Sequence, residues 1–388
     1  MRTSMYYCIA RYGDARFALL SHDFSRFGSL ASFPSRHSFK EYAAEMISIV
    51  MVGALLAILS GIMNGSFTLP MRFLGRWEWE NVWGLFIFFA CLVMPTVILG
   101  VMAPSSWSVM AQAPQSALVI AVASGFAWGF GSLLFGQSVS AIGISLANTL
   151  VLAISSALGS LLPILLLTPA RLFSPAGQRI LFAIGIELVG IVLCGWAGRL
   201  RERAAGVDAD RGGMVGHARP IGLALLMATG SGILSGIFNI GFSMAQPIAA
   251  TGMQAGLSQF ESTNLIWWIM LASGSVANLG FCGYLTVKNG SAAKLVQPGS
   301  VRLYLLSAVM AVLWGGSIFV YGASAPRLGA LGISIGWPLS LAAGLLLANA
   351  IGIALGEWRQ APRRALAWMY SGIAVLLWAV VLLSRAGN

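Results

Sequence analysis

The hydrophobic residues of this chain form long continuous runs that are separated by short polar segments. Ten runs are long enough to cross a bilayer, which takes roughly 20 apolar residues per helix. Backbone groups in lipid must be hydrogen-bonded within the chain, and runs this apolar do not suit the strands of a membrane barrel. We therefore predict ten transmembrane helices. Their approximate ranges are 47–69, 81–103, 115–137, 144–167, 179–198, 219–243, 261–285, 302–323, 329–353 and 366–384.

Two sequence motifs recur in the two halves of the chain. The first run contains "LSGIMNGSF" at 59–67 and the sixth contains "LSGIFNIGF" at 234–242, and six of the nine positions agree. The third run contains "WGFGSLLFG" at 128–136 and the eighth contains "WGGSIFVYG" at 314–322. The tripeptide "GIS" likewise stands at the start of the fourth and ninth runs. The chain therefore reads as two copies of a five-helix unit.

An odd number of helices per copy forces the second copy to insert upside down. The predicted fold class is an all-α integral membrane protein with ten transmembrane helices arranged as two inverted five-helix repeats, the architecture of many secondary transporters. The copies cover 46–198 and 219–388, and a cytoplasmic linker at 199–218 joins them. Residues 1–45 are polar, and we expect a disordered or mis-started extension there.

The composition supports a membrane location. Of the 388 residues, 58% are hydrophobic and 9% are charged, whereas soluble proteins carry roughly 25% charged residues. The net charge of +11 comes from loop residues with no basic patch among exposed aromatics, so we expect no nucleic-acid partner. The cysteines lack paired spacing and the histidines lie outside the runs, so we expect neither a metal site nor a cofactor.

The basic residues of the loops predict the orientation. The loops after the first, third, fifth, seventh and ninth runs carry thirteen arginines and lysines, and the opposite loops carry four. The positive-inside rule places the first set in the cytoplasm and both ends of the ten-helix core outside. The six basic residues of 1–45 would raise the second count to ten, so the orientation depends on that extension.

Asparagine occurs at the same place in both copies of the first motif. Asn64 and Asn239 are related by the repeat, so we expect them to face one cavity near the middle of the membrane. An amide there can pair with two hydroxyl groups of a neutral sugar. The alternative is that each asparagine only hydrogen-bonds to a neighbouring helix. The flanking glycines are expected to let helices pack closely.

Paired tryptophans open the second motif. Trp128 and Trp314 lie well inside their runs, which favours an interior position over the membrane interface, and an indole can stack on the apolar face of a sugar ring. Further polar residues on the same or following helices complete the predicted substrate site. They are Gln137, Tyr321, Asn148 and Asn278.

Glu187 is the one acid deep inside a run. A carboxylate there costs about 2.5–3.5 kcal/mol on insertion scales, so we expect it to be neutral, paired or next to water, and we predict that it couples transport to protons. One deep acid without a histidine builds neither a metal hydrolase nor a paired-aspartate protease, so we expect no enzyme. No run carries a basic residue away from its ends, which argues against phosphorylated substrates. A channel would need rings of charged residues or a filter of backbone carbonyl groups, and the sequence has the signature of neither.

Several segments resemble the L-rhamnose–proton symporter family of the drug/metabolite transporter superfamily. They are "SGIMNGSFTLPMRFLGRWEWENVW", "WGFGSLLFGQSVSAIGISLANTL", "ANLGFCGY" and "GEW". The resemblance covers about residues 50–385 and implies ten helices and proton-coupled uptake of L-rhamnose or a related deoxy sugar across the bacterial inner membrane. The chain departs from the family pattern at two positions. The family has a lysine in the segment where this chain has Gln246, and it has no acidic residue where this chain has Glu187. The alternative is an exporter of small metabolites, amino acids, nucleotides or drugs on the same fold.

Overall fold

A computed structural model describes residues 36–73, 77–142, 144–204 and 220–386 of the chain. The chain divides into two units, Met1–Ser48 and Ile49–Asn388. In the first unit the described backbone is helical from residue 36, so the predicted extension ends in a helix, and its remaining part lies outside the described residues. The second unit contains the membrane-spanning part of the chain.

All regular structure in the described residues is helical, and ten helical segments are long and apolar enough to cross a membrane, as predicted. Spans are numbered here in chain order. The helices are α3 (Arg36–Ser66), α4 (Trp79–Phe88), η3 (Phe89–Val93), α5 (Met94–Met102), α6 (Ser106–Gln112), α7 (Gln115–Ile142), α8 (Ile144–Leu167), α9 (Pro175–Ala204), α10 (Ile221–Met244), α11 (Gln246–Gln254), α12 (Gln259–Lys288), α13 (Ser300–Ser324), α14 (Gly332–Ala354) and α15 (Arg363–Arg385).

Two spans contain interruptions that hydropathy did not predict. The second span changes from α4 through the π-helical η3 to α5, whose second residue is Pro95. The sixth span was predicted to end at 243, but it continues to Gln254. A helix break at Ala245 divides it into α10 and α11, and α11 has Pro247 near its start. Proline lacks a backbone N–H and clashes with the preceding turn, so a helix adjusts or restarts at it.

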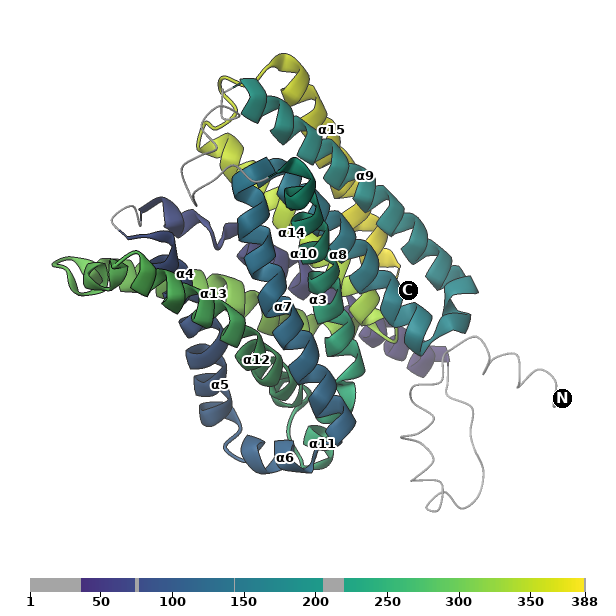
Figure 1. The fold of residues 1–388 in the computed structure, drawn as a ribbon. Coiled ribbons are helices and arrows are strands. Elements are labelled where there is room, and N and C mark those ends of the chain that lie inside the picture. The colour runs from purple at the N-terminus through teal and green to yellow at the C-terminus, as the bar shows by residue number, and fades with distance from the viewer. Residues whose placement is uncertain (1–35, 74–76, 143, 205–219, 387–388) are drawn as a thin grey trace, which may run out of the picture. The chain divides into compact units, whose positions relative to one another are not determined.

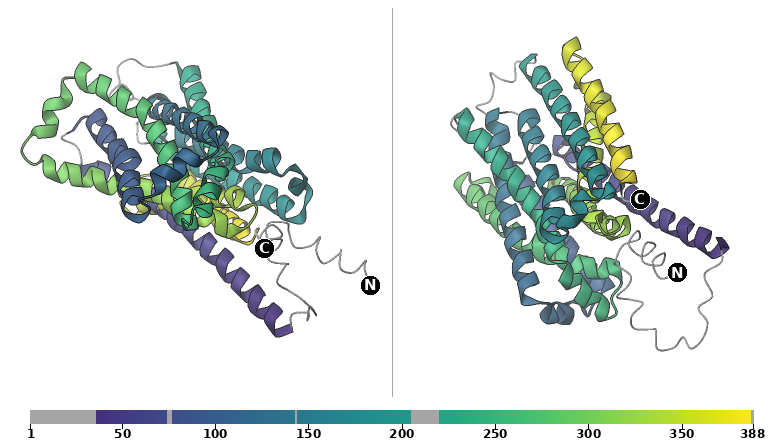
Figure 2. Two further views of the ribbon diagram at one scale, coloured as in Figure 1. Left: turned by 90° about the horizontal axis from the view of Figure 1, so that it is seen from below. Right: turned by 90° about the vertical axis from the view of Figure 1, so that its right-hand side faces the viewer.

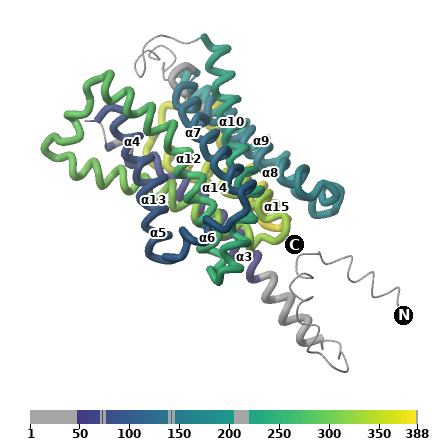
Figure 3. Tube along the Cα trace, turned by 60° about the horizontal axis from the view of Figure 1, so that its bottom comes forward, coloured from purple at the N-terminus to yellow at the C-terminus, as the bar shows by residue number. Residues whose placement is uncertain are grey.

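The helices pack in pairs that join the two halves of the chain. Helix α9 lies along α15 (Figures 1 and 2), and α10 packs against α7 and α8. Helix α12 contacts α4 and α7, and α14 contacts α8. Figure 3 shows the same grouping along the Cα trace, with α4, α5, α12 and α13 together on one side. Each half of the chain therefore packs mainly on the other half.

Glycines allow the close approach of α3 to α14, as predicted for the first motif. A Cβ atom on Gly61 would collide with the carbonyl oxygen of Ser340, and one on Gly65 would collide with that of Gly344. In the second copy, a Cβ on Gly236 would lie 2.9 Å from the Cβ of Leu158 on α8. Small residues replace side-chain bulk with backbone contact at these crossings.

Polar contacts between loops show which chain segments share a membrane side. Lys294, after the seventh span, pairs with Glu78, after the first, at 2.5 Å. Arg201, at the end of the fifth span, pairs with Glu357, after the ninth, at 3.0 Å and lies over the ring of Trp358. We call the side of these loops the odd side and the opposite side the even side. Helices α6 and α11 lie on the even side, at the bottom of Figure 1.

Candidate functional site

A cavity of about 200 Å³, called here the central cavity, lies among helices of both halves of the chain. Helices α3, α4, α7 and α8 line it from the first half, and α10, α13 and α14 line it from the second. Its described lining residues include no charged side chain. Such an interior suits a small neutral ligand better than an ion.

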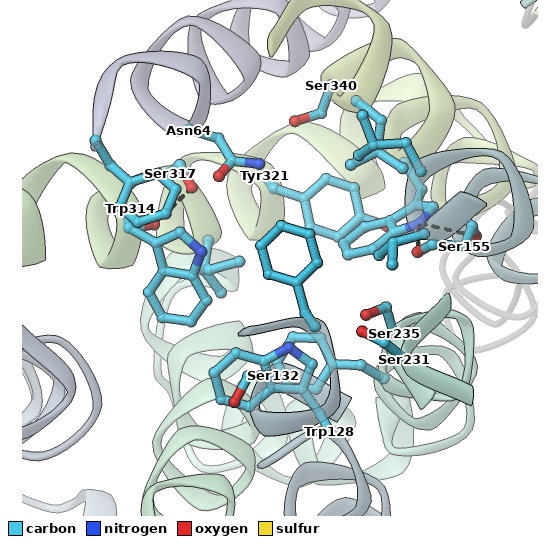
Figure 4. Close-up of a pocket in the computed structure, with 18 of the residues that line it drawn as sticks. Asn64, Trp128, Ser132, Ser155, Ser231, Ser235, Trp314, Ser317, Tyr321 and Ser340 are labelled. Atoms are coloured by element: carbon cyan, nitrogen blue, oxygen red, sulfur yellow. Dashed lines mark hydrogen bonds between the residues drawn. The ribbon is translucent and has the colours of Figure 1, made fainter. Parts of the chain in front are cut away.

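One wall of the central cavity is aromatic. Trp128 on α7 and Trp314 on α13 both line it, and their rings stack with centroids 5.2 Å apart and planes inclined by 17°. Phe238 packs on Trp128 at 5.2 Å, and Phe86 packs edge-on against Trp314 at 5.7 Å. Figure 4 shows both indoles at the edge of the cavity. The predicted interior position of the two tryptophans is therefore observed.

Four polar side chains line the central cavity without any side-chain hydrogen bond to the part of the chain that the structure describes. They are Asn64 on α3, Asn148 on α8, and Ser231 and Ser235 on α10. In Figure 4, Asn64 lies across the cavity from Ser231 and Ser235. Their donors and acceptors are free for a ligand, and leaving such groups unpaired costs free energy that a ligand can recover.

Asn239 does not face Asn64 across the cavity, which corrects the geometric expectation drawn from the repeat. Its side chain is fully buried on α10, its amide nitrogen donates to the carbonyl oxygen of Gly159 at 2.7 Å, and its amide oxygen accepts from the Tyr321 hydroxyl at 2.5 Å. Tyr321, not Asn239, lines the cavity. The longer tyrosine of α13 occupies the position between Asn239 and the cavity.

Trp337 lines the central cavity next to Tyr321. Its ring meets the Tyr321 ring edge-on at 5.4 Å, and its indole nitrogen lies 3.2 Å from the carbonyl oxygen and 3.3 Å from the hydroxyl of Ser155. On the far side of Tyr321, Trp267 stacks on Phe242 at 4.1 Å. Buried rings and hydrogen bonds thus hold this region together.

Asn278 takes the structural role that was the alternative for the membrane asparagines. It is fully buried on α12 and does not line the central cavity. Its amide oxygen accepts from the Trp83 indole at 3.1 Å and the Ser132 hydroxyl at 2.8 Å, and its amide nitrogen donates to the carbonyl oxygen of Gly129 at 3.1 Å. It therefore positions Trp83 and Ser132, which do line the cavity.

Gln137 and Asn148 lie toward the odd side. Gln137 is on α7 and is not among the residues that line the central cavity. Asn148 also lines a second cavity of about 360 Å³. The second cavity shares Asn64, Phe67 and Phe135 with the central one and reaches Arg201 on the odd side.

Glu187 lies outside the cavities described here, on the face of α9 that meets α8. Its side chain is fully buried, and one carboxyl oxygen accepts from the Ser156 hydroxyl at 2.7 Å. The other oxygen has no partner in the described residues, and neither does the buried hydroxyl of Ser160, one helical turn further along α8. Ser155, the residue before Ser156 in the chain, accepts a hydrogen bond from the Trp337 indole.

Glu261, by contrast, stabilises a helix start. Its carboxylate accepts from the backbone N–H of Ser258 at 2.8 Å, and the Ser258 hydroxyl accepts from the backbone N–H of Glu261 at 3.3 Å. This reciprocal arrangement is a capping box at the start of α12.

Sequence reasoning missed the serines of the central cavity. They are Ser60, Ser132, Ser155, Ser231, Ser235, Ser317 and Ser340. The Ser60 hydroxyl lies 2.9 Å from both the Ser317 carbonyl oxygen and the Ser340 hydroxyl, and so joins α3 to α13 and α14. A signal for two of them was present, because Ser60 and Ser235 occupy the same position in the repeated motif.

Comparison with known proteins agrees with this transporter-like interior. The family described as L-rhamnose-proton symport protein (RhaT) matches residues 46–386. An L-rhamnose-proton symporter of Cronobacter sakazakii is 26% identical over 356 residues, which are 88% of this chain and 100% of that protein. Symporters of the same name from Salmonella paratyphi B and Salmonella newport are each 24% identical over 344 residues, 86% of this chain and 96% of theirs. The match extends over all ten spans, so the chain belongs to the L-rhamnose-proton symport protein (RhaT) family, a family of transporters and not of enzymes.

Proposed function

We propose that this protein takes up L-rhamnose or a related deoxy sugar together with protons, by alternating access of the central cavity to the two membrane sides. The observation that carries the proposal is the lining of that cavity in a chain of the RhaT family. Stacked indoles stand on one wall, and amides and hydroxyls without a partner among the described residues stand on others. A sugar with an apolar ring face, a methyl group and several hydroxyls matches both kinds of surface.

The size and charge of the central cavity favour a single neutral ring. Its volume of about 200 Å³ lies below the roughly 300–1,000 Å³ of sites for drug-sized ligands. A phosphorylated or otherwise ionic substrate would need an opposite charge in the lining, and the described lining residues provide none.

The helix contacts support two inverted repeats related by an axis in the membrane plane. Equivalent helices that lie next to such an axis should touch each other across it. Span 5 packs on span 10 (α9 with α15), span 4 on span 9 (α8 with α14), and span 2 on span 7 (α4 with α12). Rocking of one repeat against the other would expose the central cavity to each side in turn.

The loop charges support an orientation with the odd side in the cytoplasm of a bacterial cell, and the proposed location is the inner membrane. Among the described residues at the odd side, Arg201, Lys288 and Lys294 illustrate the excess of basic side chains. The second cavity, which runs from the central cavity to Arg201, would then lead to the cytoplasm in this conformation.

Glu187 is the proposed proton-coupling residue. Its carboxyl is buried, has one oxygen without a partner in the part of the chain that the structure describes, and contacts α8 through Ser156. The spans α8, α14 and α15, which pack on α9, carry no charged side chain between their ends to pair with it. Losing its proton there would create an unpaired charge, which favours a conformation that admits water. Because α8 also receives the Trp337 indole through Ser155, this change can reach the central cavity.

The substrate part of this proposal is tested by exchange in proteoliposomes without any ion gradient. Vesicles loaded with an unlabelled sugar are mixed with the same sugar in labelled form, for L-rhamnose, L-fucose, L-lyxose and L-mannose in turn, and the last three also compete with L-rhamnose. We expect exchange of L-rhamnose and weaker competition by L-mannose, in which a hydroxymethyl group stands in place of the methyl group that would face the aromatic wall. Exchange of none of the four sugars would contradict the proposed substrate class, and the metabolites and drugs of the exporter alternative would then be assayed in the same vesicles.

A further inference from the structure

The two copies of the tryptophan motif differ at a position beside the central cavity. Aligning "WGFGSLLFG" with "WGGSIFVYG" places Phe135 of α7 opposite Tyr321 of α13. Both residues line the central cavity. The aromatic ring is therefore kept in both copies, and the phenolic hydroxyl is present in the second copy alone.

The equivalent asparagines of the two copies also differ in their hydrogen bonds. In the second copy, the Tyr321 hydroxyl donates to the amide oxygen of Asn239 at 2.5 Å. In the first copy, Phe135 offers Asn64 no hydroxyl, and Asn64 has no side-chain hydrogen bond within the described residues. The repeat thus contains one bonded pair and one unbonded pair at matching places.

The bonded pair ties three helices together. Tyr321 is on α13, Asn239 is on α10, and the Asn239 amide nitrogen donates to the carbonyl oxygen of Gly159 on α8 at 2.7 Å. The atoms involved are buried, so their hydrogen bonds do not compete with bulk water. Moving α13 away from α10 and α8 must break this connection.

Tyr321 also separates two cavities. A cavity of about 320 Å³ on the even side, lined among others by Phe242, Gln246 and Ile333, shares no lining residue with the central cavity. The Tyr321 ring lines the central cavity, while its hydroxyl lies 3.3 Å from the carbonyl oxygen of Ile333, which lines the even-side cavity. On the odd side, where Phe135 stands, the central and second cavities share lining residues.

We propose that the Tyr321–Asn239 hydrogen bond holds the central cavity closed toward the even side, and that its absence from the Phe135–Asn64 pair leaves the cavity open toward the odd side. Tyr321 and Asn239 are then positioning residues that bias the protein toward the conformation open to the odd side. This inference rests on the proposed alternating access. It assigns closure toward the even side to the second copy and opening toward the odd side to the first.

Side-specific labelling of a cavity residue tests the inference without sugar or protons. Ser235→Cys places a thiol at the central cavity, in a full-length protein whose four native cysteines are replaced by alanine. Vesicles with the protein in either orientation are treated with a membrane-impermeant maleimide. Separate variants, Ala330→Cys on the even side and Ala293→Cys on the odd side, report which side the reagent reaches, because both positions are exposed. With Tyr321 intact, we expect labelling from the odd side.

Tyr321→Phe removes the hydroxyl and keeps the ring. We expect it to raise the labelling rate from the even side by about two- to tenfold, the effect of one net hydrogen bond on an equilibrium. Tyr370→Phe is the matched control, because Tyr370 is more than half exposed on α15, and it should leave both rates unchanged. An unchanged even-side rate in Tyr321→Phe overturns the inference.

Phe135→Tyr is the reciprocal variant. It offers Asn64 the hydroxyl that Asn239 has, and we expect it to lower labelling from the odd side. An unchanged odd-side rate would show that the hydroxyl does not decide which side is open. Because neither readout needs transport, failed sugar exchange with altered labelling would contradict the proposed substrate and leave this inference standing.

Discussion

At the residue scale, the site combines side chains that sequence reasoning found with others that it missed. The repeat pointed to Trp128, Trp314 and Asn64, and all three line the central cavity. It also pointed to Asn239, which is buried behind Tyr321. A repeat fixes which positions are equivalent, but the partner of each side chain depends on residues from other helices, and these differ between the copies.

Asn64→Ala should weaken sugar binding. The amide lines the central cavity and has no partner in the described residues, so it is available to hydrogen-bond to a ligand. We expect the half-saturating sugar concentration for exchange to rise by about three- to tenfold. Asn349→Ala is the control, because the Asn349 amide bonds to Leu345 of its own helix. Equal half-saturating concentrations for Asn64→Ala and Asn349→Ala would show that Asn64 does not bind the sugar.

Trp314→Leu should weaken binding through lost stacking. Aromatic stacking contributes about 0.5–1.5 kcal/mol beyond the buried area, and leucine keeps the site apolar. We expect about a tenfold rise in the half-saturating concentration at an unchanged maximal exchange rate. Trp196→Leu, at a half-exposed indole on the outer face of α9, should leave both values as they are. A fall in the maximal rate alone would instead point to helix movement.

Glu187→Gln should separate coupling from binding. The amide keeps the shape and the hydrogen bond from Ser156 but cannot exchange a proton. We expect sugar exchange to persist while accumulation driven by a pH gradient is lost. Glu261→Gln, at the capping box of α12, is the control that should still accumulate sugar. Normal accumulation by Glu187→Gln would assign Glu187 a structural role.

At the element scale, hydropathy predicted all ten spans, because length and apolarity are properties of a local stretch. It did not predict the π-helical stretch in the second span, the break before α11 or the short helix α6. Those features depend on how a helix accommodates proline and on packing against distant helices, and a window average contains neither.

Gly61→Ala should destabilise the contact between α3 and α14. The added methyl group would meet the backbone of Ser340 and Gly344, which cannot move aside like a flexible side chain. Overpacking of this kind costs about 1–3 kcal/mol. Thermal unfolding in detergent should occur at a lower temperature than for Gly100→Ala, where a Cβ meets nothing within 4 Å. Equal unfolding temperatures would show that the contact tolerates separation.

At the scale of the whole molecule, the family and the ten spans describe a transporter, and the cavity lining suggests its cargo. Weak internal similarity in the sequence was enough to propose two inverted copies. It was not enough to show a difference between them, because the hydrogen bond between Tyr321 and Asn239 depends on how distant helices pack. The proposed cycle needs both properties, two related halves and a difference between them.

The most direct test of the central claim is accumulation of labelled L-rhamnose by proteoliposomes with an inwardly directed proton gradient. We predict that the internal concentration rises above the external one and returns to equality when a protonophore dissipates the gradient. An internal concentration that reaches only the external value, with or without the gradient, would contradict proton-coupled sugar uptake.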